Sequence, residues 1–253
     1  MTLLQVQSLS KTFGGVQAVR DVSFTLQAGE MLALIGPNGA GKSTTFNMVG
    51  GQLQPDHGRV LLNADNLVGL APRAIWRKGV GRTFQIAQTF ASLTVVENVQ
   101  MALLSRDQRI FSWWRRANAH RRSDALALLA QVDMAAQADR PCSQLAYGDV
   151  KRVELAIALA HDPQLLLMDE PTAGMAPAER VALMQLARQL AKARQMGVLF
   201  TEHSMDVVFG QADRVAVLVR GQLLAEGTPQ AIRDDARVQQ AYLGSGLVLE
   251  KQV

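Results

Sequence analysis

The stretch Gly36-Pro37-Asn38-Gly39-Ala40-Gly41-Lys42-Ser43 decides the fold of this 253-residue chain. It fits the pattern G-x-x-x-x-G-K-[ST], whose glycines let the backbone wrap around a phosphate group while successive N–H groups point at its oxygens. In that arrangement Lys42 would reach the β- and γ-phosphates of a nucleotide, and the Ser43 hydroxyl would ligate Mg²⁺. The alternative interpretation is a glycine-rich turn that merely connects two elements.

The flanking residues favour phosphate binding over a simple turn. Met31–Ile35 is a short apolar run typical of a buried parallel strand, and residues 44–50 are compatible with a helix. The loop therefore joins a strand to a helix N-terminus, where the positive end of the helix dipole attracts anions. The sequence thus predicts an α/β core with a phosphate-binding loop.

Length and composition exclude several classes of protein. The chain is long enough for one large domain or two small ones. No apolar run approaches the roughly 18–20 residues that span a bilayer, and the first residues lack the pattern of a signal peptide. The single cysteine, Cys142, excludes an internal disulfide and suits a reducing cytosol. The net charge of +4 is compatible with an anionic ligand or a membrane surface, and by itself does not imply nucleic acid.

The N-terminal region predicts an antiparallel sheet. Alternating polar and apolar residues indicate short strands and turns in residues 2–27, and residues 59–62 would close the sheet with them. Phe13 lies between turn residues, so it could stay exposed and stack on a flat ligand such as adenine. A small-core position is equally compatible with burial statistics for an aromatic residue.

The middle of the chain predicts helices. Residues 94–97 form a capping-box pattern at a helix start, and residues 123–132 are amphipathic. Leu145-Ala146-Tyr147-Gly148 precedes another helix, whose apolar residues recur at a spacing of three to four from Asp149 onward. The N-terminus of that helix follows a glycine, which suits anion binding.

Two later strands end in polar residues. The run Leu165–Asp169 is followed by Glu170, at the edge of a parallel sheet where ligands bind. Asp169 fits as a partner of Mg²⁺, often through water, and Glu170 fits as a general base that polarises an attacking water. The run at residues 198–201 precedes His203, a candidate phosphate contact, although a lone histidine is more often structural.

One further strand, at residues 81–85, ends in a candidate ligand. Gln85 could ligate a metal or position water, although a lone glutamine is more often a surface residue.

Together these motifs resemble the ATP-binding cassette (ABC) ATPases, and the resemblance runs over nearly the whole chain. Residues 36–43 resemble the Walker A loop, and Leu165–Asp169 with the following Glu170 resembles Walker B. Gln85 resembles the Q-loop glutamine and His203 the switch histidine. Each match beyond Walker A is weak alone, whereas all of them in order at family-like spacing are strong.

This resemblance implies ATP and Mg²⁺ as ligands and assigns roles to individual residues. It implies catalytic roles for Lys42, Glu170 and His203, and a metal site of Ser43, Gln85 and Asp169. The implied nucleotide-binding residues, with Phe13 as the adenine-stacking aromatic, are Phe13, Gly36, Pro37, Asn38, Gly39, Ala40, Gly41, Lys42, Ser43, Thr44, Gln85, Leu145, Ala146, Tyr147 and Gly148.

The chain departs from the family pattern at two places. Leu145-Ala146-Tyr147-Gly148-Asp149 occupies the signature position, usually LSGGQ, and keeps only its leucine and second glycine. Asp149 would repel ATP at close range, so we expect it to point away from the nucleotide. In the D-loop, Ala176 stands where Asp or Asn is common.

Finer features are similar to the branched-chain amino acid importer ATPases. The lipopolysaccharide-export ATPases share the C-terminal tail but usually keep the LSGG form, so they remain the alternative. The similar runs are Phe13-Gly14-Gly15, Arg82-Thr83-Phe84-Gln85, Leu145-Ala146-Tyr147-Gly148, Ala173-Gly174-Met175, Gly227-Thr228-Pro229 and Ala241-Tyr242-Leu243-Gly244.

The implied fold is that of an α/β P-loop NTPase, a RecA-like parallel-sheet core with an N-terminal antiparallel β subdomain and an inserted α-helical subdomain. A single ABC ATPase domain would span residues 1–253. The core and β subdomain would occupy about 1–86 and 163–253, and the helical signature subdomain about 87–162.

The implied function is ATP hydrolysis that powers membrane transport. The resemblance implies integral membrane permease subunits and a second ATPase subunit, identical or related, as partners around two ATPs. An extracytoplasmic solute-binding protein would act indirectly, and no nucleic acid is expected. The implied location is peripheral, on the cytoplasmic side of the inner (plasma) membrane.

Two other classes of function are weighed against this one. Soluble cassette proteins that act on ribosomes usually carry two cassettes, and those that act on DNA split the ATPase with a long coiled coil. This chain has one uninterrupted cassette and no heptad run. A small-molecule kinase with the same phosphate loop would not need the Gly148 helix or the Glu170 and His203 pair.

A basic stretch from residue 106 to 122 holds six arginines around the pair Trp113-Trp114. One interpretation is a solvated helix face whose tryptophans pack against the body of the protein. The other is a surface that meets a partner or lipid headgroups, because Trp and Arg are enriched at interfaces and at membrane boundaries.

Alanine at both Trp113 and Trp114 separates these interpretations. For a docking surface, the melting temperature and basal ATP hydrolysis stay near the parent values while assembly with the membrane partner weakens. The weakening is about thirty-fold, because such anchors carry about 2 kcal/mol. For tryptophans packed in the core, a thermal melt shows a loss of about 3–5 kcal/mol.

Overall fold

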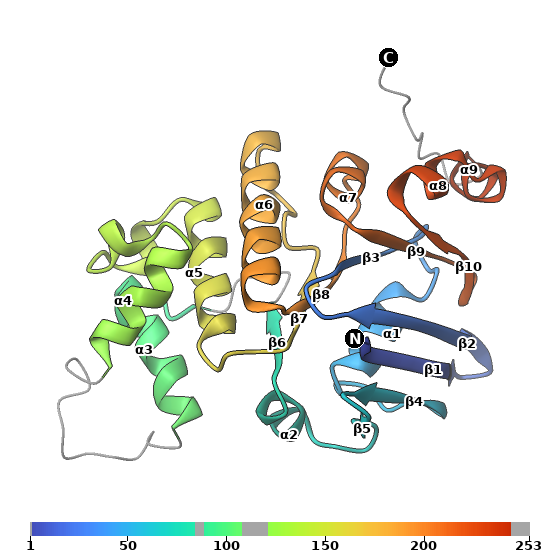
Figure 1. Ribbon diagram of the computed structural model, residues 1–253, viewed down its shortest axis with the longest axis horizontal. Coiled ribbons are helices and arrows are strands. Elements are labelled where there is room, and N and C mark those ends of the chain that lie inside the picture. The colour runs from blue at the N-terminus through green and yellow to red at the C-terminus, as the bar shows by residue number, and fades with distance from the viewer. Residues whose placement is uncertain (1, 84–88, 108–120, 244–253) are drawn as a thin grey trace.

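The computed structural model describes residues 2–83, 89–107 and 121–243 (Figure 1). In this part of the chain two β-sheets lie toward one side of the molecule, and helices α3 to α5 lie toward the other. The helices are α1 Lys42–Val49, α2 Pro72–Arg77, α3 Val95–Arg106, α4 Arg122–Gln131, α5 Tyr147–Leu159, α6 Pro177–Arg194, α7 Met205–Gln211, α8 Pro229–Asp234 and α9 Ala236–Leu243.

The antiparallel sheet predicted for the N-terminal region is confirmed. Its strand order is β2-β1-β4-β5, with bounds Val16–Gln27, Thr2–Phe13, His57–Leu62 and Asp65–Asn66. Strands β1 and β2 are each 12 residues long, whereas the sequence predicts short strands. They continue through a bulge at Ser8 and Asp21, both at positive φ. A bulge adds a residue and shifts the alternation, so strict alternation underestimates strand length.

The second sheet has six strands in the order β10-β9-β3-β8-β7-β6. Strands β9, β3, β8, β7 and β6 run parallel to their neighbours, and β10 pairs antiparallel with β9 at the edge. This arrangement confirms the predicted α/β class. The bounds are β3 Met31–Ile35, β6 Val80–Thr83, β7 Leu165–Asp169, β8 Gly197–Thr201, β9 Arg214–Val219 and β10 Gln222–Gly227.

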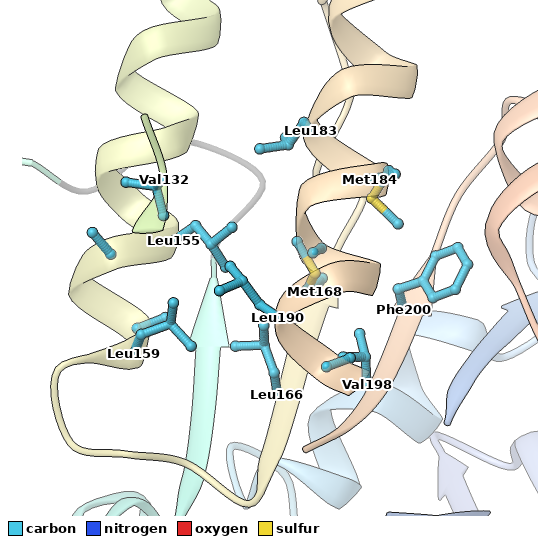
Figure 2. Packing of buried hydrophobic residues seen from close by; sticks show 14 of the residues in the cluster. Val132, Leu155, Leu159, Leu166, Met168, Leu183, Met184, Leu190, Val198 and Phe200 are labelled. Carbon is cyan, nitrogen blue, oxygen red and sulfur yellow. The ribbon is translucent and has the colours of Figure 1, made fainter. Parts of the chain in front are cut away.

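Burial on both faces explains why the central strands are continuously apolar. In β3, Met31, Ala33 and Ile35 belong to one hydrophobic cluster, and Leu32 and Leu34 belong to the other. Alternate residues of a strand point to opposite faces, so both faces of the sheet are covered. Figure 2 shows the first cluster, where α5 and α6 pack their apolar side chains over the sheet.

Helices α3 to α5 are inserted between β6 and β7, and they pack on one another (Figure 1). The predicted capping box at the start of α3 is confirmed, because the Glu97 N–H donates to Thr94 Oγ1 and the Thr94 N–H donates to Glu97 Oε2. Helix α5 begins at Tyr147, two residues before the predicted Asp149. The subdomain boundaries near residues 87 and 162 stay a prediction.

Residues 229–243 form two helices, and not one continuous helix. Helix α8 ends before Asp235, whose backbone is extended, and α9 follows. The Asp235 carboxylate accepts a hydrogen bond from the Arg237 N–H at 2.8 Å. An aspartate that bonds the backbone two residues ahead interrupts one helix and begins the next.

No helix in the described ranges is both long and apolar enough to cross a bilayer.

A histidine that lies between α5 and β7 is held in its neutral form. His161 stacks on Trp76 of α2, with ring centroids 4.6 Å apart. Burial lowers the pKa of His161 to about 4, although backbone hydrogen bonding at Val80 and the charge of Asp162 act in the opposite direction. The unfolded chain therefore binds the proton more readily than the folded one.

We expect His161 to make folding sensitive to acid. Its contribution to stability is complete above pH 6.5, the ordinary pKa, and is lost as the pH falls toward 4. Thermal melts at pH 7 and pH 5 should therefore differ less in His161→Gln than in the parent protein. The control is His57→Gln, at an exposed position. An equal pH dependence in His161→Gln and the parent would contradict the expectation.

Candidate functional site

The carboxyl ends of the five parallel strands meet at one edge of the six-stranded sheet. Strand β3 runs into the glycine-rich loop, β7 ends at Asp169 and β8 ends at Thr201. The register pairs Asp169 with Thr201 directly, so the segments that follow β7 and β8 start side by side. This edge is where open α/β sheets bind ligands.

Glycines are required at two points of the loop. A Cβ on Gly36 would lie 2.1 Å from the carbonyl oxygen of Leu218 in β9, and Gly36 has φ +152°. A Cβ on Gly41 would lie 2.6 Å from the carbonyl oxygen of Ala18 in β2, and its φ is +97°. The loop is therefore wedged between β9 and β2, and only glycine fits at either point.

The loop ends at the N-terminus of α1, which no side chain caps. Gly41 is the N-cap residue, and the first helical residues are Lys42, Ser43 and Thr44. The leading N–H groups of a helix have no partner inside it, and they form an anion site when no side chain covers them.

The Lys42 side chain is buried and folded against the loop. Its Nζ donates to the carbonyl oxygens of Gly36 at 2.7 Å and Pro37 at 3.1 Å. Burial lowers the pKa of Lys42, and the carboxylates of Glu170 and Asp169 oppose that shift. An ammonium has three donors, so these two bonds leave one N–H for an anion held by the loop.

One hydroxyl bonds both the Asp169 side chain at the end of β7 and the Glu170 backbone that follows it. Thr201 Oγ1 donates to Asp169 Oδ1 at 2.8 Å and accepts from the Glu170 N–H at 3.1 Å. Glu170 has φ +45°, a conformation that costs free energy in a residue other than glycine. The threonine therefore fixes the backbone at the point where the chain turns out of the sheet.

The side chains of Glu170 and His203 meet above this edge. Glu170 Oε1 and His203 Nε2 are 2.8 Å apart, within hydrogen-bond distance. The His203 side chain is 45% exposed and that of Glu170 is 23% exposed. A partly exposed carboxylate held by an imidazole can accept a proton from water, the task of a general base.

Three residues near this edge were not singled out by the sequence analysis as site residues. Arg82 of β6 donates to Asn47 of α1 at 2.8 Å, and lies 3.6 Å from Asp169 Oδ2. Thr201 and Glu202 complete the set. A lone polar residue in or beside an apolar strand gives no periodic signal, and only its place at the end of β6 or β8 marks it.

Phe13 is exposed, as required of a residue that stacks on a ligand. It lies at the end of β1 with 48% of its surface accessible, and Lys11 Nζ is 5.6 Å from its ring centroid. The small-core interpretation of Phe13 is therefore wrong.

A cavity of about 600 Å³ lies beside the glycine-rich loop. It is lined by residues 37–40 of the loop, by the β9–β10 turn at Arg220 and by α9. The hydroxyl of the buried Tyr242 of α9 also meets the loop, because it interacts with the backbone of Gly36. Burial raises the pKa of this hydroxyl, and the Gly36 backbone opposes that shift. The C-terminal helix is thus part of the surroundings of the loop.

The signature residues lie apart from the loop of the same chain. Helix α5, which begins at Tyr147, lies on the far side of α6 from β3 and α1 (Figure 1). The Tyr147 side chain is 45% exposed, and no side chain caps the α5 N-terminus. The Asp149 carboxylate accepts from Gln137 Nε2 at 3.1 Å. Its expected orientation away from a nucleotide stays a prediction.

The oxygens at the sheet edge suit a hard cation. No group of three or more His, Cys, Asp or Glu side chains that could hold a metal occurs within the described ranges. The Ser43 hydroxyl and the Asp169 carboxylate are the oxygen donors that Mg²⁺ prefers when it also keeps water and phosphate ligands. The predicted ligand Gln85 lies outside the described residues.

The strand, glycine-rich loop, buried lysine and strand-end carboxylates define a P-loop nucleoside triphosphatase. A model of the ABC transporter family matches residues 19–173 of the chain, and a model of the branched-chain amino acid ATP-binding cassette transporter family matches residues 222–247. This chain belongs to the ABC transporter ATPase family.

Curated relatives match almost the full length. The high-affinity branched-chain amino acid transport ATP-binding protein LivG of Salmonella typhimurium is 40% identical over 252 residues, with 96% of this chain and 98% of LivG covered. The lipopolysaccharide export system ATP-binding protein LptB of Acidithiobacillus ferridurans is 36% identical over 242 residues, with 96% and 97% covered.

Solved structures share the fold. An ATP-binding cassette of an ABC transporter in its ADP conformation has a TM-score of 0.86 at 30% identity, with 96% of this chain and 99% of that chain covered. A bacterial ABC transporter cassette solved as a dimer has a TM-score of 0.75 at 26% identity, with 90% and 99% covered.

We expect Lys42→Ala to lose nucleotide binding. Charged hydrogen bonds contribute about 1.5–3 kcal/mol, so the affinity for ATP should fall by at least about tenfold. Calorimetric titration measures the change, and a melting curve checks that removal of a buried ammonium leaves the fold intact. The control is Lys192→Ala, at an exposed position on α6. Unchanged affinity in folded Lys42→Ala would remove the lysine from the site.

Proposed function

We propose that this ATPase is the nucleotide-binding subunit of a membrane transporter that imports branched-chain amino acids or similar small polar solutes. The observation that carries the proposal is the Glu170–His203 pair, 2.8 Å apart, at the sheet edge that also holds the phosphate loop. The named relative LivG and the C-terminal family match support the choice of cargo.

The phosphate loop would bind the β- and γ-phosphates of ATP. Lys42 would place its remaining N–H on them, since its Nζ already holds two loop carbonyls. The Ser43 hydroxyl and Asp169 would hold Mg²⁺, which when bound neutralises charge on the phosphate oxygens. Phe13 would stack on adenine, because it is exposed at the end of β1. The backbone of Gly36, Pro37, Asn38, Gly39, Ala40, Gly41 and Thr44 would cradle the phosphates.

Glu170 would act as the general base. Its carboxylate would accept a proton from the attacking water, and a positioned base contributes about 10²–10⁴-fold to a rate. His203, bonded to Glu170 Oε1, would fix the carboxylate and contact the γ-phosphate. Catalysis of phosphoryl transfer rests on such positioning and on charge stabilisation, because the protein forms no covalent bond to the phosphate.

The position of the signature residues supports a two-subunit site. Leu145, Ala146, Tyr147 and Gly148 lie at the start of α5, a helix across α6 from β3 and α1 of its own chain, and no side chain caps its N-terminus. We propose that they complete the ATP site of a second ATPase subunit, identical or related. One of the similar solved cassettes is a dimer.

The subunit would work at the cytoplasmic side of the inner membrane, bound peripherally to integral permease subunits. An extracytoplasmic solute-binding protein would act through the permease, and nucleic acid plays no part. Lipopolysaccharide export is the alternative cargo, supported by the 36% identity to LptB. Mass spectrometry of the membrane proteins that copurify with this chain decides between an importer permease and an exporter permease.

Replacement of Glu170 by Gln should separate binding from turnover. We expect Glu170→Gln to bind ATP with near-parent affinity while hydrolysis falls by about 10²–10⁴-fold, because the amide cannot accept the proton. Size-exclusion chromatography with ATP should then show a trapped dimer. The control is Asp162→Asn, which makes the same carboxylate-to-amide change before the opposite end of β7. Near-parent hydrolysis in Glu170→Gln would exclude the base role.

A further inference from the structure

Glu202 is a buried carboxylate that joins two segments of the site. It is 4% exposed, and it directly precedes His203. Its Oε1 accepts from the Thr172 N–H at 2.9 Å and from Thr172 Oγ1 at 2.6 Å, and its Oε2 accepts from the His203 N–H at 3.2 Å. A buried carboxylate is costly unless it is hydrogen-bonded, and here both oxygens have donors.

The two segments that Glu202 joins follow β7 and β8. The carboxylate loop is residues 170–176, which starts at Glu170, and the histidine loop is residues 202–204, which contains His203. Thr172 is 1% exposed, so the bond between the loops lies inside the protein.

A second side chain joins the same two loops. Arg180 of α6 donates through Nε to the Met175 carbonyl oxygen at 2.7 Å and through Nη1 to Ser204 Oγ at 2.8 Å. A planar guanidinium fixes the direction of both bonds at once. Ala176 offers no polar side chain in the carboxylate loop, and Arg180 holds that loop by its backbone instead.

Backbone hydrogen bonds between residues three positions apart stiffen the carboxylate loop between its contacts with Glu202 and Arg180. The Ala173 N–H donates to the Glu170 carbonyl oxygen, and the Met175 N–H donates to the Thr172 carbonyl oxygen, both at 3.1 Å. A displacement of Thr172 is therefore passed to Glu170 within two residues. The same displacement acts on His203 through Glu202.

We propose that Glu202 is a positioning residue for ATP hydrolysis, which with Arg180 locks the two loops so that His203 stays bonded to Glu170. The inference rests on the proposed roles of Glu170 and His203. Glu202 itself faces away from the reacting atoms, because Thr172 and the His203 backbone occupy its oxygens. Its effect on the reaction passes through the imidazole.

The test uses Thr172→Val, which removes one donor to Glu202 with almost no change in shape, together with Glu202→Gln. We expect kcat to fall by about 10- to 100-fold, the effect of a misplacement of about 1 Å, while KM for ATP stays within about twofold. Thr172→Ser, which keeps the hydroxyl, should restore kcat. Thr25→Val, on an exposed position of β2, is the matched control.

A histidine signal gives a readout that does not depend on activity. In histidine-labelled protein the chain has four imidazoles, and His203→Ala identifies the one of interest. Thr172→Val should shift the His203 resonances as strongly as Glu170→Gln does, and leave those of His57 and His161 in place. In a His203→Ala background Thr172→Val should lower kcat no further, because its effect passes through that imidazole.

Three outcomes would overturn the proposal. They are unchanged His203 resonances, an equal fall of kcat with and without His203, and a lower melting temperature without a change in kcat. If Glu202→Gln does not fold, kcat and the His203 resonances are compared in Thr172→Val and Arg180→Lys instead. Failure of the proposed function would give a different result from failure of this inference. In that case Glu170→Gln and His203→Ala would themselves leave ATP hydrolysis near the parent rate.

Discussion

The parallel pairing of β7 with β8 is the constraint on which the site depends. Its register sets Asp169 opposite Thr201, and the threonine hydroxyl then bonds both the Asp169 carboxylate and the Glu170 backbone. A slip by one residue would turn every side chain of β8 to the other face of the sheet. The contact of Glu170 with His203 therefore follows from strand pairing in the core. This pairing sets the positions of the carboxylate loop and the histidine loop, which follow β7 and β8.

The same sheet and its helices separate two surfaces of the chain, one at the glycine-rich loop and one at the N-terminus of α5. Helix α6 lies between α5 and the strand β3 that leads into the glycine-rich loop, so this loop and the uncapped N-terminus of α5 face different surroundings (Figure 1). The apolar cluster of α5, α6 and the sheet makes this separation rigid, because close-packed interiors transmit displacement and do not absorb it. This separation is the arrangement on which the proposed pairing of two ATPase subunits rests.

Much of the fold could be predicted from local chemistry. The strand, loop and helix around residues 36–43 and the capping box at Thr94 depend on glycine conformation and helix caps that act within a few positions. The long strands β1 and β2 and the break at Asp235 were not predicted. A bulge and a side-chain bond two residues ahead override the pattern that alternation or helical spacing indicates.

The sequence by itself determined the residue types of the site, since the phosphate loop, Asp169, Glu170 and His203 can be recognised from motif and order. Gln85 and the tryptophan pair stay predictions. Only the tertiary structure decided that Lys42 folds onto its own loop and that Glu202 is buried against Thr172. Thr172 and Glu202 lie 30 positions apart, so their hydrogen bond depends on strand register, which no local pattern encodes. The Lys42 bond to Gly36 is local in sequence, and it depends on the burial of the lysine side chain in the folded protein.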